Sequence, residues 1–270
     1  MTEKDRVKIS DDVITPGLLS RYEATVGGVD TGGHSPHGLH WCLATPTIPT
    51  AELGPDGHPA NSAILPETLL PRRMWASSEV EFLAPLPTAG PVQRTSTVLS
   101  TENKSGASGE LVFVRVEHMT SAGGAECVRE VQTLVYREAS KAASLLPASK
   151  GYQAGECDFS ETWMPTPQML FRYSALTFNT HRIHYDAAYA QSQEGYPALV
   201  VHGPMMASLL LRLATGHLGH GAIKGFAYRG RSPAYCGQNL HLEMKLGDGD
   251  HDLTVFGADG RIVMSAKVTT

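Results

Sequence analysis

The part of the sequence that most constrains the fold is an apolar segment that begins at Gly203-Pro204 and ends near Thr215-Gly216. Its apolar residues recur at spacings of three and four, as in an α-helix: Met205, Met206, Leu209, Leu210 and Leu213. Gly203 is the expected N-cap, Pro204 suits the first helical position, and Thr215-Gly216 offer a stop. Arg212 is the only charged residue here, so other parts of the protein must cover most of the helix surface.

Two segments that precede this helix bring titratable side chains towards its start. The apolar and aromatic run 169–178 predicts a strand, and a polar stretch from Asn179 to Asp186 follows it. After 195–197 the chain returns through 199–202 directly into the helix. The N-terminus of a buried helix carries unpaired N–H groups and a positive partial charge. Beside titratable groups, it predicts a site for chemistry on an oxygen that becomes negative.

Strand-like segments separated by turn residues occur in two sets. The first set covers 80–83, 92–101, 111–118 and 128–137, and the second covers 223–231, 238–246, 253–256 and 261–268. Residues 103–106 are an expected turn, and apolar and polar residues alternate along 240–246, as in a half-buried antiparallel strand. A short helix capped by Thr15 and ended by Gly27-Gly28 precedes the first set. The pattern predicts an α+β fold built from two related units.

The expected domain division follows from this repetition. We predict one unit over residues 1–138, a linker over 139–154 and a second unit over 155–270, which carries the polar stretch and the apolar helix. Residues 1–10 are expected to be a frayed polar lead. The Gly-, Pro- and His-rich stretch 32–71 should have little regular structure, and long ordered loops of this kind tend to be functional. We expect it to act as a lid that shapes the substrate pocket.

Bulk composition excludes several classes of protein. The formal net charge is −5, and no basic stretch interleaves with aromatic residues, so we expect no nucleic-acid partner. No apolar run approaches the roughly 20 residues of a membrane span, and the charged N-terminus does not resemble a signal peptide. Cys42, Cys127, Cys157 and Cys236 are scattered without paired spacing. Reduced thiols in a cytoplasmic protein are the simplest interpretation.

The motifs of both halves resemble those of a known superfamily. The relevant stretches are LTFNTHRIHYD at 176–186, GYPALVVHGP at 195–204, ELGPDGHP at 52–59, LPRRMWA at 70–76 and LVFV at 111–114. They resemble the MaoC-like (R)-specific enoyl-CoA hydratases, and in particular the mesaconyl-CoA (methylfumaryl-CoA) and itaconyl-CoA hydratases and the type 2 hydroxyacyl-thioester dehydratases. The similarity covers nearly the whole chain. It implies a double hotdog fold, in which each half wraps a central helix in an antiparallel meander.

The resemblance also implies an activity, the addition of water to an unsaturated acyl-CoA. Members of the wider superfamily carry an Asp, four further residues and a His on a loop that overhangs the active site. Here that spacing joins Asn179 to His184, so the carboxylate is absent. The first half is expected to be degenerate, because it carries no counterpart of this loop. The substrate implied is a short, branched, dicarboxylic acyl-CoA, such as mesaconyl-CoA or itaconyl-CoA giving citramalyl-CoA.

The candidate site residues follow from the needs of hydration. The backbone N–H around Gly203 would stabilise the thioester oxygen, and His184, with an unperturbed pKa of about 6.5, would carry both proton transfers. Asn179 would orient the water, and Asp186 would be a second base or the orienter of a histidine. Side chains that could bind the substrate are His181, His202, Arg72, Arg172 and Arg182.

Several alternatives remain open at the level of the sequence. One is a 3-hydroxyacyl-thioester dehydratase of fatty acid metabolism, and another is a non-catalytic subunit that binds acyl thioesters. A hotdog thioesterase would be expected to place a carboxylate on the central helix, where this chain has none between Gly203 and Gly216. The histidines at 181, 184 and 202 lack Cys or Glu partners at a familiar metal-ligand spacing, so we expect no metal. We expect no cofactor besides the coenzyme A of the substrate, and both a monomer and a homodimer are compatible with the sequence.

Overall fold

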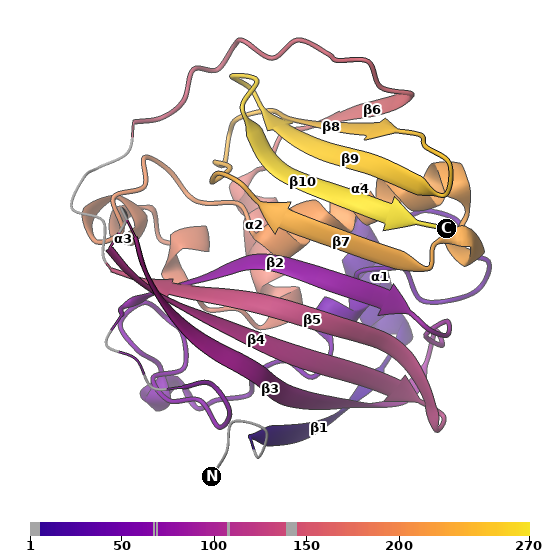
Figure 1. Cartoon of the computed structure of the whole chain (residues 1–270), viewed down its shortest axis with the longest axis horizontal. Helices are drawn as coiled ribbons and strands as arrows, with labels where there is room; N and C mark the ends of the chain where they lie inside the picture. The colour runs from indigo at the N-terminus through magenta and orange to yellow at the C-terminus, as the bar shows by residue number, and fades with distance from the viewer. Residues whose placement is uncertain (1–5, 67, 69, 107–108, 139–144) are drawn as a thin grey trace.

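The computed structural model describes residues 6–66, 68, 70–106, 109–138 and 145–270, and its main feature is a single antiparallel sheet (Figure 1). The first half contributes β1 (Val7–Ile14), β2 (Arg72–Phe82), β3 (Gly90–Gly106), β4 (Gly109–Ala122) and β5 (Ala125–Arg137). The second half contributes β6 (Phe159–Trp163), β7 (Gly225–Gly230), β8 (Leu240–Lys245), β9 (Asp250–Gly257) and β10 (Ile262–Thr269). The ten strands lie in the order β1-β3-β4-β5-β2-β7-β10-β9-β8-β6.

The two halves join edge to edge in the middle of this sheet. β2 pairs with β7 in antiparallel register, from Ser77 opposite Arg229 to Glu81 opposite Gly225. Each half therefore contributes five antiparallel strands, of which β3–β5 and β8–β10 form meanders of three, and the predicted α+β fold is confirmed. The predicted meander was wrong for β2, which pairs with β5 instead of β3. Strands β1–β5 fall within the predicted first unit and β6–β10 within the second. The exact boundaries stay a prediction, and residues 139–144 of the expected linker lie outside the described residues.

The helices lie behind the sheet in the view of Figure 1, where α1 (Pro16–Val26), α2 (Pro167–Thr177) and α4 (Gly203–Leu218) are grouped. α3 (Ala187–Ser192) lies at the side of the molecule. Single turns of 3₁₀-helix are η2 (Leu39–Cys42), η3 (Thr50–Glu52), η4 (Arg182–His184) and η5 (His220–Ala222). The stretch 32–71 has little regular structure, as predicted. Its described residues contain the two 3₁₀ turns η2 and η3 and one isolated β-bridge between Leu53 and Pro59.

The apolar helix α4 has the predicted place in the core but different ends. Ten of its residues are buried, from Met205 to Thr215, and they belong to the main hydrophobic cluster or lie beside it. The N-cap is His202 rather than Gly203, which is the first helical residue. The helix also continues past Gly216 to Leu218 and ends at Gly219, whose φ of 84° suits glycine. Gly216 does not stop the helix because the sequence offers a second glycine three residues later.

Segment 169–178 is helical, so the strand prediction for it was wrong. Thr166 caps α2 by accepting a hydrogen bond from the amide of Met169, and Pro167 occupies the first turn. The buried residues Leu170, Tyr173 and Ser174 recur at helical spacing. The capping threonine and the proline outweigh the strand preference of the aromatic side chains, because they fix the start of a helix before the apolar run begins.

The ends of the first sheet also differ from the prediction. Residues 7–10 are part of β1, which pairs with β3 along its whole length, rather than a frayed lead. Residues 103–106 continue β3 instead of forming a turn, and β6 was not predicted. These strands lie at or near sheet edges, where one face is open to solvent and the apolar pattern is weak. Among the described helices, none is both long and apolar enough to cross a membrane.

Candidate active site

A loop between α2 and α4 carries the polar stretch predicted from the sequence. It leaves α2 at Phe178, which adopts a left-handed conformation with φ of 48°, and passes through η4 and α3 before it reaches His202. His184 ends η4 and is buried, and its Nδ1 lies 2.7 Å from the carbonyl oxygen of Val200. The short segment 199–201 before α4 therefore holds the imidazole in place.

The Val200 carbonyl selects the tautomer of His184. A carbonyl oxygen only accepts, so Nδ1 must carry the proton and Nε2 of the neutral ring has a free lone pair. No hydrogen bond to Nε2 is found among the described residues. Burial lowers the pKa of His184 well below its usual value, and the neighbouring His202 and His181 lower it further. The ring is therefore neutral at pH 7, in the form that accepts a proton.

His202 packs against one face of the His184 ring. The two imidazoles stack with centroids 3.6 Å apart and planes 19° apart. The Nε2 of His202 lies 2.8 Å from the hydroxyl of Ser174 on α2, and its Nδ1 is buried with no described partner. Burial lowers the pKa of His202 to about 3, so this ring is also neutral. With only 1 % of its surface exposed, His202 is placed to orient His184 rather than to touch a substrate.

The start of α4 offers free donors next to these rings. His202 makes no side-chain capping bond, and no hydrogen bond from the amides of Gly203 or Met205 occurs among the described residues. A Cβ placed on Gly203 would meet nothing within 4 Å, so there is open space on the Cβ side of this residue. Unpaired N–H groups at the positive end of a buried helix can stabilise an oxyanion. His202 links the two features, because its ring stacks on that of His184 and its backbone precedes the first residue of α4. Their convergence on one thioester stays a prediction.

Asn179 and Asp186 are already engaged in holding the loop. The side-chain oxygen of Asn179 accepts a hydrogen bond from the amide of His181 at 3.0 Å. Asp186 caps α3 through the amide of Tyr189 and pairs with Arg182 at 2.8 Å. The bond from Tyr189 and the guanidinium of Arg182 lower the pKa of Asp186, so the carboxylate stays ionised. The geometry gives it a structural place and no contact with His184.

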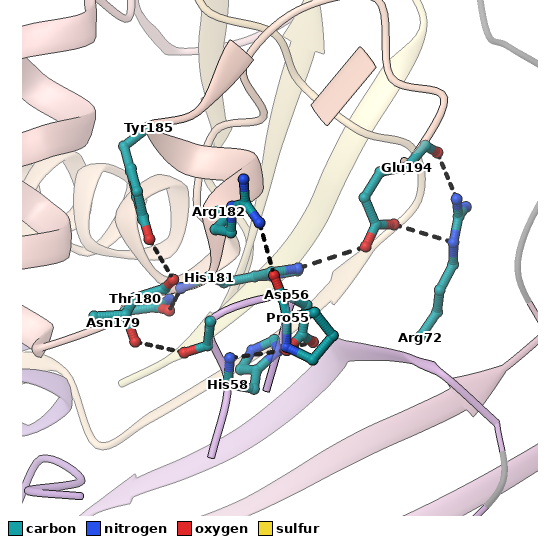
Figure 2. A network of polar contacts seen from close by, with 11 residues as sticks. Pro55, Asp56, His58, Arg72, Asn179, Thr180, His181, Arg182, Tyr185 and Glu194 are labelled. Atoms are coloured by element: carbon teal, nitrogen blue, oxygen red, sulfur yellow. Dashed lines mark hydrogen bonds and ion pairs between the residues drawn. The ribbon is translucent and has the colours of Figure 1, made fainter. Parts of the chain in front are cut away.

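A loop from the first half docks directly on this polar loop, as Figure 2 shows for the residues around Pro55 and Thr180. The amide of Arg182 donates to the carbonyl of Asp56 at 2.9 Å, and its guanidinium donates to that of Pro55 at 3.0 Å. The Thr180 hydroxyl donates to the carbonyl of Gly57, which lies 123 residues away in the chain. Gly57 has a φ of +89°, and a Cβ there would lie 1.8 Å from the Thr180 oxygen. Only glycine permits this close approach.

Three side chains at this junction form a compact polar group. Nδ1 of His58 lies 2.8 Å from a carboxylate oxygen of Asp56, and the rings of His58 and His181 are 4.1 Å apart (Figure 2). The potential ligand atoms of Asp56, His58 and His181 all lie within 4.8 Å of one another. Among the described residues, this is the group with the spacing for a metal ion; of the histidines considered from the sequence it includes His181 but not His184 or His202. Both carboxylate oxygens of Asp56 already contact His58, one through its backbone N–H and the other through Nδ1.

The arginines predicted to bind substrate have different surroundings. Arg72 is buried and pairs with Glu194 at 3.0 Å, and the other carboxylate oxygen of Glu194 is 3.9 Å from Nε2 of His181. Arg182 is held by Asp186 and Pro55. Arg172 is exposed on α2 and donates to the carbonyl of Ala24 on α1, so the structure does not bring it to the site.

Sequence reasoning missed Asp56, His58 and Glu194 as site residues. Asp56 and His58 stand in the motif ELGPDGHP, which was noted only as a family resemblance. Glu194 lies in an ordinary polar stretch before Gly195 and gave no signal. The loop of the first half lies against the polar stretch 179–186, where the ring of His58 contacts that of His181. The expectation that the first half shapes the acyl pocket stays a prediction.

Comparison with known proteins gives consistent relatives. The family model described as hydroxyacyl-thioester dehydratase type 2 matches residues 37–236. The chain is 39 % identical over 229 residues to a mesaconyl-C(4)-CoA hydratase of Chloroflexus aurantiacus, covering 85 % of this chain and 81 % of that one. A solved MaoC-like dehydratase from Phytophthora capsici superposes with a TM-score of 0.75 at 18 % identity, covering 99 % and 97 % of the two chains.

A second solved structure supports the fold. A protein from Mycobacterium tuberculosis described as having a double hotdog fold aligns with a TM-score of 0.60 at 12 % identity, over 97 % of this chain and 95 % of that one. Together with the two five-stranded halves joined at β2 and β7, these structures confirm the double hotdog arrangement expected from the sequence.

Proposed function

The chain belongs to the hydroxyacyl-thioester dehydratase type 2 family and is a hydro-lyase acting on acyl-CoA, and we propose that it adds water reversibly to a short, branched, dicarboxylic enoyl-CoA. Mesaconyl-CoA or itaconyl-CoA, giving citramalyl-CoA, are the proposed substrates. The mesaconyl-C(4)-CoA hydratase that this chain resembles supports the choice. The observation that carries the proposal is the neutral His184 ring beside the unpaired amides of Gly203 and Met205.

The amides at the start of α4 would polarise the thioester. As water attacks the β-carbon, the double bond shifts towards the α-carbon and the thioester oxygen takes on enolate charge. Two backbone donors aimed at that oxygen stabilise it more than the ground-state carbonyl, and loss of one such donor costs about 2.7–4 kcal/mol in the transition state. The open space at Gly203 is where we place this oxygen.

His184 would carry the proton. Its Nε2 lone pair takes a proton from the attacking water, and the resulting imidazolium gives that proton to the α-carbon, so the ring returns to its starting state. The Val200 carbonyl keeps Nδ1–H fixed during both steps. Asn179 remains the proposed partner of the water, although only its amide N–H groups are free of described partners.

A 3-hydroxyacyl-thioester dehydratase of fatty acid metabolism is the second candidate, favoured by the description of the matching family model. A thioesterase has less support, because the described helix α4 contains no carboxylate. The experiment is to incubate the protein with mesaconyl-, itaconyl- and crotonyl-CoA and to follow the enoyl-thioester absorbance. Loss of signal with the dicarboxylic substrates supports the first proposal. Preference for crotonyl-CoA supports the second, and no loss with any of them supports a non-catalytic binding subunit.

Coenzyme A would enter as part of the substrate, with no other cofactor. The proposed site would take residues from both halves of one chain, and the contacts between the two loops support a site complete in a single copy. A homodimer and a cytoplasmic location stay predictions, and light scattering of the purified protein tests the first.

A further inference from the structure

The nucleophilic water needs a second contact besides His184. A water molecule that gives one proton to His184 must have its other O–H oriented by an acceptor. The carbonyl oxygen of Asn179 already accepts from the amide of His181 within the loop, so one of its two lone pairs holds the loop in place. An acceptor on another residue would bind the water without sharing the oxygen that fixes the loop.

His58 has the properties of that acceptor. One oxygen of Asp56 accepts from the backbone amide of His58 at 2.9 Å, and the other lies 2.8 Å from Nδ1. Burial opposes the charge of Asp56, but the bonds from His58 outweigh it and lower the pKa of the carboxyl, so Asp56 is ionised and can only accept. Nδ1 of His58 must then carry the proton. Its Nε2 therefore carries a lone pair, and this atom has no hydrogen-bond partner among the described residues.

The ring stays neutral under physiological conditions. Burial, with a contribution from the nearby Arg73, lowers the pKa of His58 to about 4 although Asp56 opposes the shift. Groups that face it are Asp56, Arg73 and His181. The side chain is 19 % exposed, so it is accessible to a small molecule.

His58 and His184 share a neighbour. The ring of His181 lies 4.1 Å from that of His58 and 5.5 Å from that of His184, with its plane at 88° to the latter. His181 itself is directed to Glu194, whose carboxylate lies 3.9 Å from its Nε2. Two neutral imidazoles, one from each half of the chain, therefore flank the same ring, and each has a free Nε2.

We propose that His58, held by Asp56, binds the water that attacks the substrate and the β-hydroxyl that this water becomes. The inference rests on the proposed hydratase function. One O–H of the water donates to Nε2 of His184 and is the proton transferred, first to that nitrogen and then to the α-carbon. The other O–H donates to Nε2 of His58 and stays on oxygen throughout. The oxygen forms its bond to the β-carbon as the carbon–carbon double bond is lost, and both imidazoles end neutral.

Three variants test the role of His58 in the rate. His58→Ala removes the acceptor, and His58→Gln restores one through its side-chain oxygen. In Asp56→Asn, the side-chain oxygen of the new asparagine must accept from the backbone amide of His58, so its NH₂ group faces Nδ1 of His58. Nδ1 then accepts a hydrogen bond, the ring proton moves to Nε2, and Nε2 becomes a donor. We expect kcat to fall about 10- to 100-fold in His58→Ala and Asp56→Asn, the worth of one hydrogen bond to a reacting group. His58→Gln should retain more activity than His58→Ala.

A binding measurement separates this role from a structural one. In a His184→Ala background, which stops proton transfer, 3-hydroxybutyryl-CoA and butyryl-CoA differ only in the β-hydroxyl. Adding His58→Ala should weaken binding of the first about 10-fold and leave the second unchanged. Equal losses for both ligands, or no loss for either, would overturn the proposal. If the wild-type protein hydrates an enoyl-CoA and both Asp56→Asn and His58→Ala keep the wild-type rate, this inference alone is wrong. If the wild-type protein is inactive on every enoyl-CoA, the proposed function is wrong as well.

Discussion

The imidazole of His184 lies against that of His202 with ring centroids 3.6 Å apart, directly before the first residue of α4. This stack joins the catalytic loop to the helix start, which are two features that the sequence shows separately. Nε2 of His184 has no described partner and Nε2 of His202 lies next to the hydroxyl of Ser174, so we propose His184 as the reactive member of the pair and His202 as its support.

Replacement of His184 by alanine should remove proton transfer. We expect kcat on the preferred enoyl-CoA to fall about 10²- to 10⁴-fold with little change in KM, because the ring acts on the water rather than on the acyl-CoA. The control is His217→Ala in the last turn of α4, at the opposite end of the helix from the site. A His184→Ala protein with more than half of the wild-type rate would remove this residue from the mechanism.

Substitution of Gly203 by alanine should impair activity without unfolding the protein. The new methyl group meets no atom within 4 Å, so the melting temperature should not fall, but it fills the space proposed for the thioester oxygen. We expect kcat/KM to drop at least about 10-fold, the effect of weakening one oxyanion donor. Gly216→Ala is the matched control in the same helix, where the nearest atom is a methyl of Val29 at 3.7 Å. Full activity of Gly203→Ala would place the oxyanion elsewhere.

Substitution of Gly57 by alanine should separate the two loops. Its Cβ would overlap the carbonyl oxygen of Thr180 at 1.8 Å, so the junction between the halves must open. Gly33→Ala is the control, because Gly33 has a similar φ of +84° but no atom within 4 Å of its Cβ. Urea unfolding and the hydratase rate should both show a larger loss for Gly57→Ala than for Gly33→Ala. Equal losses would mean that backbone strain alone accounts for the effect.

Stability should decline as the solution is acidified below neutrality. The folded protein lowers the pKa of His58 to about 4 and that of His202 to about 3, whereas both titrate near 6.5 in the unfolded chain. Between these values the unfolded state binds more protons, so the free energy of unfolding is highest above pH 6.5 and falls as pH decreases. Each such imidazole contributes a slope of about 1.4 kcal/mol per pH unit.

The measurement for this prediction is urea unfolding at a series of pH values from 7 to 4. The buried His37 and His118, each with a pKa lowered to about 3, add to the slope in the same direction. His58→Gln removes one titrating group and should reduce the slope by about one proton. An identical slope in this variant would show that His58 is protonated in the folded protein.

Local pattern in the sequence was enough to place α4 and most of the strands. Spacings of three and four residues and the glycine-proline start identify α4, because they follow from helix geometry alone. The error at 169–178 has the same basis: aromatic residues suit both a strand and a helix, and the cap at Thr166 lay just before the segment considered. The family resemblance drew attention to Asn179, His184 and Gly203.

What the sequence by itself determined was a buried helix with an uncapped start, a nearby polar loop and the meanders around them. Only the tertiary structure decided which atoms of the loop are free, since the Val200 carbonyl fixes the proton of His184 and the His181 amide occupies Asn179. It also brought Asp56 and His58 against the polar stretch 179–186, where we propose the site. Their loop docks through backbone carbonyls, which every residue possesses, so no pattern of residue types could reveal the contact.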